Sequence, residues 1–87
     1  NLIGAKLVGA KMTEANLTRA NLSEADLTLA NLTRANLTDA SLWGAELTEA
    51  NLSDADLTRA NLKGANLKQT KFCKTTMPDG TKDSSGC

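Results

Sequence analysis

The chain has 87 residues, enough for one small domain, and its ten basic and ten acidic residues cancel to a formal net charge of zero. A neutral chain has little electrostatic attraction for nucleic acid or for an anionic membrane, so neither is expected as a partner. No apolar run reaches the roughly 20 residues of a membrane-spanning helix, and there is no histidine to act as a general base or metal ligand.

A five-residue word repeats from Asn1 to Lys74: a small residue, often Asn or Asp, a central Leu, often Thr or Ser, and a variable residue. Leucine fills 13 of the 15 central positions, and Met12 and Phe72 fill the other two. Alanine precedes the centre by two positions in every complete word until Thr70 takes that slot. Because the chain begins inside the repeat and without Met, we expect its natural start to lie upstream.

The five-residue period excludes a regular helix or a flat strand. In an α-helix a five-residue step rotates the leucine by about 140°, which scatters the leucines around the surface. In a flat strand an odd step places successive leucines on opposite faces. Within one word, however, Ala and Leu lie two residues apart and face the same way in an extended segment. A bend after each word keeps every such pair inside, so the chain is expected to wind as a coil.

The word A-[N/D]-L-x-x resembles that of pentapeptide repeat proteins, and the resemblance covers about 74 of the 87 residues. It implies an all-β solenoid, a right-handed quadrilateral parallel β-helix with four words per coil and thus about 3.7 coils of about 20 residues in residues 1–74. Residues 75–87, with the turn-forming sequence Pro78-Asp79-Gly80, are expected to form a capping tail over the final coil. The tail, CKTTMPDG…SGC, also resembles the end of many cyanobacterial members.

Charged residues provide an independent check on the 20-residue coil. Exposed side chains stacked at i+20 should avoid like charges, since opposite charges on neighbouring strands are favourable. Two columns of the variable slot alternate in sign: Glu14, Arg34, Asp54 and Lys74, and Arg19, Asp39 and Arg59. The exception at this spacing is Asp26, which is expected to lie next to Glu46. A coil of 15 residues would instead place residues of like charge next to one another in adjacent coils.

The interior is predicted to consist of leucine columns lined by alanine, because a narrow coil overpacks with a larger side chain in the alanine slot. The predicted core residues are Leu17, Leu22, Leu27, Leu32, Leu37, Leu42, Leu47, Leu52, Leu57, Leu62 and Phe72. We expect Asn and Asp to bond local backbone at the bends, and the column Thr18, Thr38 and Thr58 to form a ladder on one face.

The two cysteines, Cys73 and Cys87, are candidates for a disulfide that holds the tail, and two unrelated free thiols are the alternative. A bridge would favour an oxidising compartment such as the periplasm or the thylakoid lumen, whereas free thiols would favour the cytoplasm. With two thiols and no histidine, neither a metal nor another cofactor is expected. At the other end, the first coil has no cap in this chain. Either upstream residues cover it, or a homodimer forms when the Leu2 and Leu7 layers of two copies stack.

Outward apolar residues are the candidates for an interaction surface: Trp43, Leu29, Ile3 and Val8. Trp43 and Leu29 are expected near the same corner, one coil apart. The alternative interpretation is scattered surface hydrophobic residues, with Trp43 covering the bend beside Gly44. The carboxylates occupy outward slots of a convex rod, which offers no convergent catalytic groups, so an enzyme is not expected.

The leading hypothesis is therefore a non-enzymatic structural or protein-interaction module with a protein partner that the sequence does not identify. The resemblance implies an alternative, because long acidic members of this family mimic DNA and bind gyrase or other topoisomerases. A rod of about 3.7 coils is about 18 Å tall, and DNA of that length carries about ten phosphate charges, whereas this chain is neutral. Mimicry is thus disfavoured. A fragment of a longer repeat protein is the third hypothesis.

Overall fold

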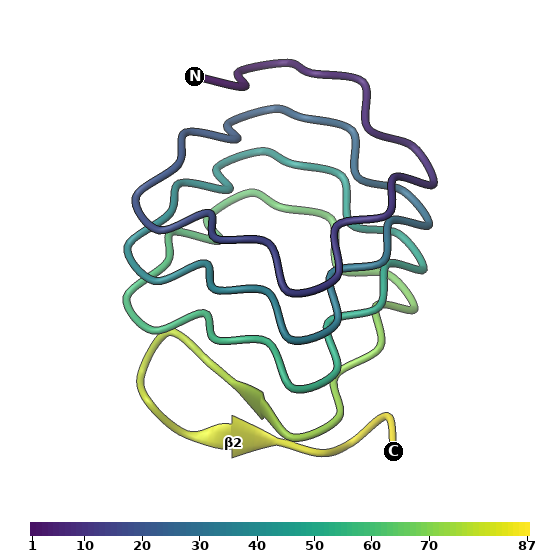
Figure 1. The fold of residues 1–87 in the computed structure, drawn as a ribbon, viewed down its shortest axis with the longest axis vertical. Coiled ribbons are helices and arrows are strands. Elements are labelled where there is room, and N and C mark those ends of the chain that lie inside the picture. The colour runs from purple at the N-terminus through teal and green to yellow at the C-terminus, as the bar shows by residue number, and fades with distance from the viewer.

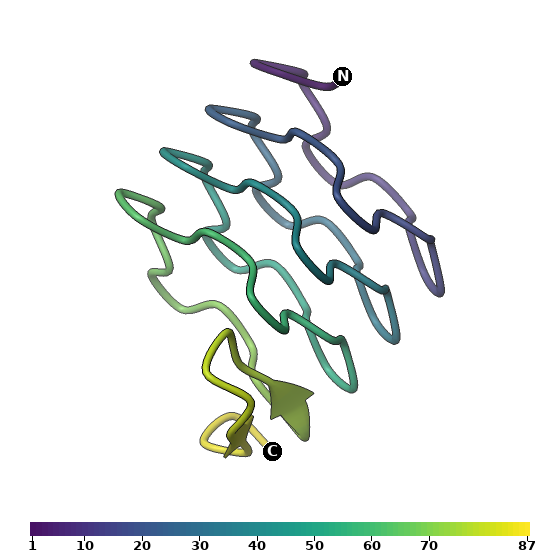
Figure 2. The same cartoon turned by 90° about the vertical axis from the view of Figure 1, so that its left-hand side faces the viewer.

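The computed structural model describes residues 1–87 and shows a solenoid of stacked coils that begins at the N-terminus and ends in a hairpin (Figure 1). Parallel backbone bridges join each word to the word 20 residues later, from Lys6 with Asp26 to Asp56 with Thr76. Four words therefore complete one coil, and Figure 2 shows the coils as separate layers. The predicted right-handed quadrilateral β-helix is confirmed. The structure has no helix long and apolar enough to cross a bilayer.

Each of the four sides is a column of words, named here by its central residues. Side one contains Leu2, Leu22, Leu42 and Leu62, and side two contains Leu7, Leu27, Leu47 and Leu67. Side three contains Met12, Leu32, Leu52 and Phe72, and side four contains Leu17, Leu37, Leu57 and Met77. The backbone register of the coil runs past residue 74, since Arg59 N still donates to Pro78 O at 3.0 Å.

In an interior word each backbone N–H has an acceptor, as a closely packed backbone requires. In residues 36–40, the N–H groups of Asn36, Leu37 and Asp39 donate to carbonyls of the adjacent coils. Ala40 N donates to Leu37 O at 3.0 Å and closes the corner. The remaining donor, Thr38 N, reaches the Asn36 side chain at 3.0 Å.

That side-chain bond explains the Asn or Asp of the repeat. It occurs in all ten words that have Asn or Asp before the central residue, with N···O distances from 2.9 to 3.2 Å. The hydroxyls of Thr18 and Thr58 donate to the same acceptors, Asn16 and Asp56. The expected ladder of Thr18, Thr38 and Thr58 is not hydrogen-bonded from coil to coil, because the hydroxyls of Thr18 and Thr58 bond within their own words.

The variable slot lies at the third position of each corner turn, where the backbone φ is positive. Eleven non-glycine residues adopt φ between 53° and 63° at this slot, and Gly4, Gly9, Gly44 and Gly64 occupy it elsewhere. A left-handed conformation is costly for an L-residue, and the adjacent-coil hydrogen bonds impose it. The corners consequently present the variable side chains to solvent.

The core is complete only in the middle of the solenoid. The leucines from Leu22 to Leu57 are fully buried, and the alanines from Ala25 to Ala60 line the same interior. The predicted core residues Leu17, Leu62 and Phe72 pack against this cluster but remain partly exposed, because they lie in the end coils. In the alanine slot Thr75 is also fully buried, and its hydroxyl donates to Leu52 O at 2.6 Å.

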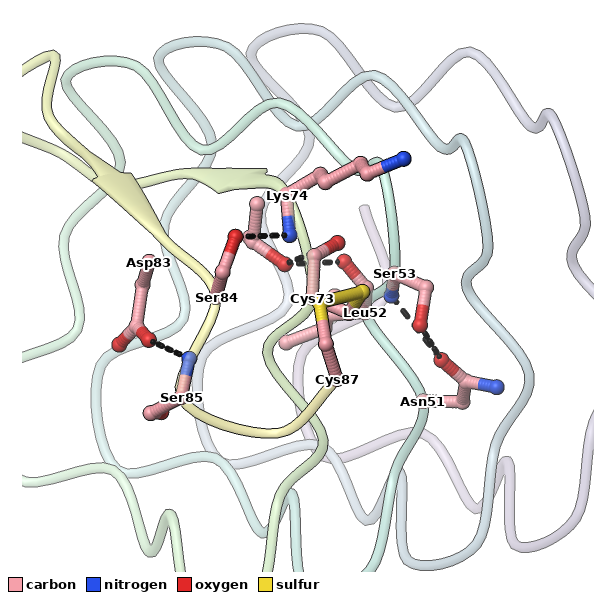
Figure 3. The surroundings of a disulfide bond; sticks show 10 residues. Asn51, Leu52, Ser53, Cys73, Lys74, Asp83, Ser84, Ser85 and Cys87 are labelled. Carbon is pink, nitrogen blue, oxygen red and sulfur yellow. Dashed lines mark hydrogen bonds between the residues drawn. A yellow bond between two sulfur atoms is a disulfide. The ribbon is translucent and has the colours of Figure 1, made fainter.

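The tail folds back along the last coil as a hairpin of β1 (Thr75–Thr76) and β2 (Lys82–Asp83), paired antiparallel. The disulfide between Cys73 and Cys87 joins its end to side three (Figure 3). Gly86 N donates to Phe72 O at 2.8 Å, and a Cβ on Gly86 would lie only 3.1 Å from that backbone. These contacts involve residues 72–77, so the tail borders sides three and four and leaves sides one and two uncovered.

Candidate interaction surfaces

The four predicted apolar residues all face outward. Their exposed fractions are 52% for Ile3, 56% for Val8, 56% for Leu29 and 46% for Trp43. Trp43 lies in the corner turn that Ala45 N closes onto Leu42 O, whereas Leu29 lies in the turn that Ala30 N closes onto Leu27 O. These are successive corners, after side one and after side two. The expectation that Trp43 and Leu29 share a corner is therefore wrong.

Trp43 stands in a column with Ser23 in the coil before it and Lys63 in the coil after it. The corners of the third and fourth coils carry no side chain beside this column, because Gly44 and Gly64 fill their variable slots. A Cβ on Gly44 would approach the Glu24 side chain to 3.3 Å, so the corner is closely packed on one side. The half-exposed indole thus projects from a flat corner and can offer both apolar contact and an N–H donor.

The predicted charge columns form ion pairs at two of their steps. Arg34 Nε lies 3.1 Å from Glu14 Oε2, and Arg59 Nε lies 2.8 Å from Asp39 Oδ1. The other steps of the two columns form no ion pair. Asp26 and Glu46 are bridged neighbours, as expected, and Glu46 also accepts from Asn66 Nδ2 at 3.0 Å. Exposed pairs of this kind contribute about 0.2–1 kcal/mol each, so they adjust register more than they stabilise the fold.

Charge is segregated by coil, which the neutral total conceals. Residues 21–60, the two middle coils, contain seven acidic and two basic residues. Residues 1–20 contain three basic and one acidic residue, and residues 61–80 contain four lysines and one acidic residue. An acidic belt therefore lies between two basic end coils. Summing the charge over each predicted 20-residue coil would have found this pattern in the sequence.

Hydrogen bonds keep several aspartates of the belt ionised. The Thr28 and Thr58 side chains and backbone lower the pKa of Asp26 and Asp56, respectively. The Arg59 guanidinium, which bonds Asp39, lowers the pKa of that carboxyl as well. Because these groups are exposed, each effect is modest, but all act in the same direction.

The lowered pKa values predict a loss of stability in acid. A carboxyl whose folded-state pKa is depressed contributes stability above its unfolded pKa of about 3.9, and this is lost as the pH falls through the folded value. We expect Asp56→Asn to lessen the decline in the free energy of unfolding below about pH 4, because Asn serves this slot in neighbouring coils. Asn16→Asp, on the same side, should steepen the decline. Urea denaturation across pH 2–6 measures both slopes, and equal slopes would contradict the prediction.

The predicted homodimer would stack the first coils of two copies. Leu2, Leu7, Met12 and Leu17 are partly exposed there and pack on the core from one side only. Lys6 and Lys11 occupy the edge slots of this coil. Two such edges would bring like charges together, so a dimer of this kind should strengthen with salt. The homodimer remains a prediction.

The surface has no detectable pocket, and no group of three or more His, Cys, Asp or Glu residues could hold a metal ion. The outward slots of the coils are thus the places where this chain displays distinctive chemistry.

Comparison with known proteins gives one family and several solved structures. Residues 1–34 and 35–72 match the family model described as pentapeptide repeats. A pentapeptide repeat protein from the Arabidopsis thaliana thylakoid lumen is 28% identical with a TM-score of 0.84, over 98% of this chain and 67% of that one. A pentapeptide repeat protein from the cyanobacterium Nostoc is 34% identical with a TM-score of 0.49, over 76% of this chain and 63% of that one. No curated protein matches this sequence. The chain spans about two thirds of the length of these two structures.

Proposed function

This chain belongs to the pentapeptide repeat family, and on that premise we propose that it is a non-enzymatic module that binds another protein through its outward slots. Members of this family are generally structural or interaction modules. The alanines and leucines of each word pack in the interior, so binding specificity must come from the outward residues. The proposal rests on the exposure of Trp43. Its side chain is 46% exposed at a corner where glycines fill the variable slots. Exposed aromatic residues are enriched at protein interfaces.

A capture experiment tests this function. Wild-type protein and Trp43→Ala are immobilised and exposed to a cyanobacterial lysate, and the bound proteins are identified by mass spectrometry. We expect a partner that Trp43→Ala no longer retains, because truncation of a buried interface aromatic costs at least about 2 kcal/mol at a hot spot. Leu29→Ala, at the next corner, tests whether the effect is confined to the corner that carries Trp43. A partner retained equally by all three proteins, or by none, would count against the Trp43 surface.

The charge distribution lends little support to mimicry of DNA. The acidic belt is interrupted at both ends by basic coils, so a DNA-binding enzyme would meet alternating potential along the rod. Inhibition of gyrase supercoiling by excess protein would reverse this preference.

An oxidising compartment such as the thylakoid lumen is the location that we favour for this chain. The disulfide between Cys73 and Cys87 supports it, because such bonds persist where thiols are not kept reduced. The similarity to the Arabidopsis lumen protein is compatible with it.

A further inference from the structure

The two ends of the solenoid present different backbone groups. In each interior word the central residue and the variable residue donate their N–H groups toward the C-terminal end, where the carbonyl of the alanine slot also points. The C-terminal edge of a coil therefore has two donors for each acceptor. The N-terminal edge has the reverse ratio, since it presents the N–H before the central residue and two carbonyls.

The donor-rich edge is uncovered on sides one and two. The N–H groups of Leu62, Gly64, Leu67 and Gln69 have no protein acceptor. One coil earlier, the equivalent N–H groups, beginning with that of Leu42, donate to carbonyls of residues 61–68 at 2.7 to 3.1 Å. Residues 79–87 hydrogen-bond only to residues 72–77 and to one another. An unpaired strand edge of this kind is a template for an added strand.

The side chains beside this edge are basic. Lys63 and Lys68 are exposed in the slot after the central residue of each word, and neither has an ion-pair partner. Two pairs of charged side chains one coil apart form ion pairs, Arg34 with Glu14 and Arg59 with Asp39. A strand added under Lys63 and Lys68 would make the same contacts if it carried acidic residues five positions apart.

We propose that residues 61–70 form a docking edge for an extended acidic segment of another protein, which adds to sides one and two as a further layer. The four free N–H groups supply hydrogen bonds to its backbone, and Lys63 and Lys68 select its carboxylates. The excess of backbone donors favours the same partner, because carboxylate oxygens only accept. This proposal deepens the proposed interaction function and rests on it.

A second copy of this chain is a poorer occupant of the edge. Its acceptor-rich N-terminal coil would place Ile3 and Val8 under Lys63 and Lys68, which offers the lysines no carboxylate. That coil is itself basic, so two coils of like charge would adjoin. The hairpin would also obstruct its third and fourth sides.

The test is an NMR titration of the 15N-labelled protein with a blocked peptide, ANLEGANLEG, which places Glu after each central leucine. Its matched control has Gln in place of both Glu residues, and a ten-nucleotide oligothymidine serves as a different anion. We expect the acidic peptide to shift the amides of Leu62, Gly64, Leu67 and Gln69. The control peptide should bind about tenfold more weakly, as the loss of two exposed ion pairs implies.

Two double variants give the charge test. Lys63→Gln with Lys68→Gln should weaken the acidic peptide about tenfold, whereas Lys6→Gln with Lys11→Gln changes the net charge equally and should leave binding intact. Equal weakening in both, shifts at other amides, or tighter binding of the oligothymidine at the same amides would overturn the proposal.

The capture experiment separates this proposal from the proposed function. If a Trp43-dependent partner is still captured by the Lys63 and Lys68 double variant while the acidic peptide fails to bind wild type, the interaction function stands and the docking edge is wrong. Peptide binding at the edge without any Trp43-dependent capture would support the edge and count against the Trp43 surface.

Discussion

Leu37→Ala is expected to lower the free energy of unfolding by about 2–5 kcal/mol, the range for large-to-small substitutions in a core. Leu37 is fully buried between Leu17 and Leu57 of the same column, in a core cluster made of leucines and alanines. Because backbone hydrogen bonds hold the stacked coils in register, these neighbours have little freedom to fill a cavity, so the cost should lie in the upper half of the range. Denaturation in urea measures it, with circular dichroism as the signal.

Leu2→Ala is the matched control, because it removes the same atoms from a partly exposed position in the first coil. It should cost less than half as much as Leu37→Ala. Equal losses at the two positions would mean that the end coil is as firmly packed as the middle. A loss below about 1 kcal/mol at Leu37 would show that adjacent coils relax into the space.

The coil could be predicted from sequence because one physical constraint recurs fifteen times. A leucine every fifth residue is incompatible with helix and flat strand, and the columns through Glu14 and Arg59 then favoured 20 residues per turn. The structure has that period, and the ion pairs to Arg34 and Asp39 lie at that spacing. The role of Asn and Asp could also be predicted from the sequence, since the hydrogen bond from the N–H two residues later to their side chains is local.

The surfaces were less predictable, because they depend on slots whose backbone conformation the repeat does not reveal. Placing Trp43 and Leu29 at different corners requires knowing that the slot after the leucine and the variable slot belong to the same turn. The threonine column has no hydrogen bonds between coils for a related reason, since the hydroxyls of Thr18 and Thr58 bond the side chains of Asn16 and Asp56 within their own words. The open edge at residues 61–70 depends on where the tail returns, which the position of Cys87 in the sequence does not determine.

Removal of the disulfide is expected to have the second large effect. Cys73→Ser with Cys87→Ser opens a loop of about 15 residues, which should lower the free energy of unfolding by about 3 kcal/mol in the chain-entropy account. Treatment of the wild type with dithiothreitol should reproduce the loss. Denaturation of oxidised, reduced and doubly substituted protein provides the comparison, and a difference below about 0.5 kcal/mol would contradict it.

The loss should begin in the tail, because little else holds that segment. Strands β1 and β2 have two residues each, and an isolated two-stranded hairpin is marginally stable in water. Beyond the pairing of β1 with β2, the end of the tail is held by the Gly86 N–H bond to Phe72 O and the Lys74 N–H bond to Ser84 Oγ. Hydrogen exchange should therefore accelerate at Gly86 without the disulfide, while the amide of Leu37 keeps most of its protection. Ser84→Ala, which removes one of these bonds and leaves the disulfide, should change Gly86 far less. If Gly86 and Leu37 lost protection together, the tail and the solenoid would unfold as one cooperative unit, and the disulfide would stabilise every coil through the last one.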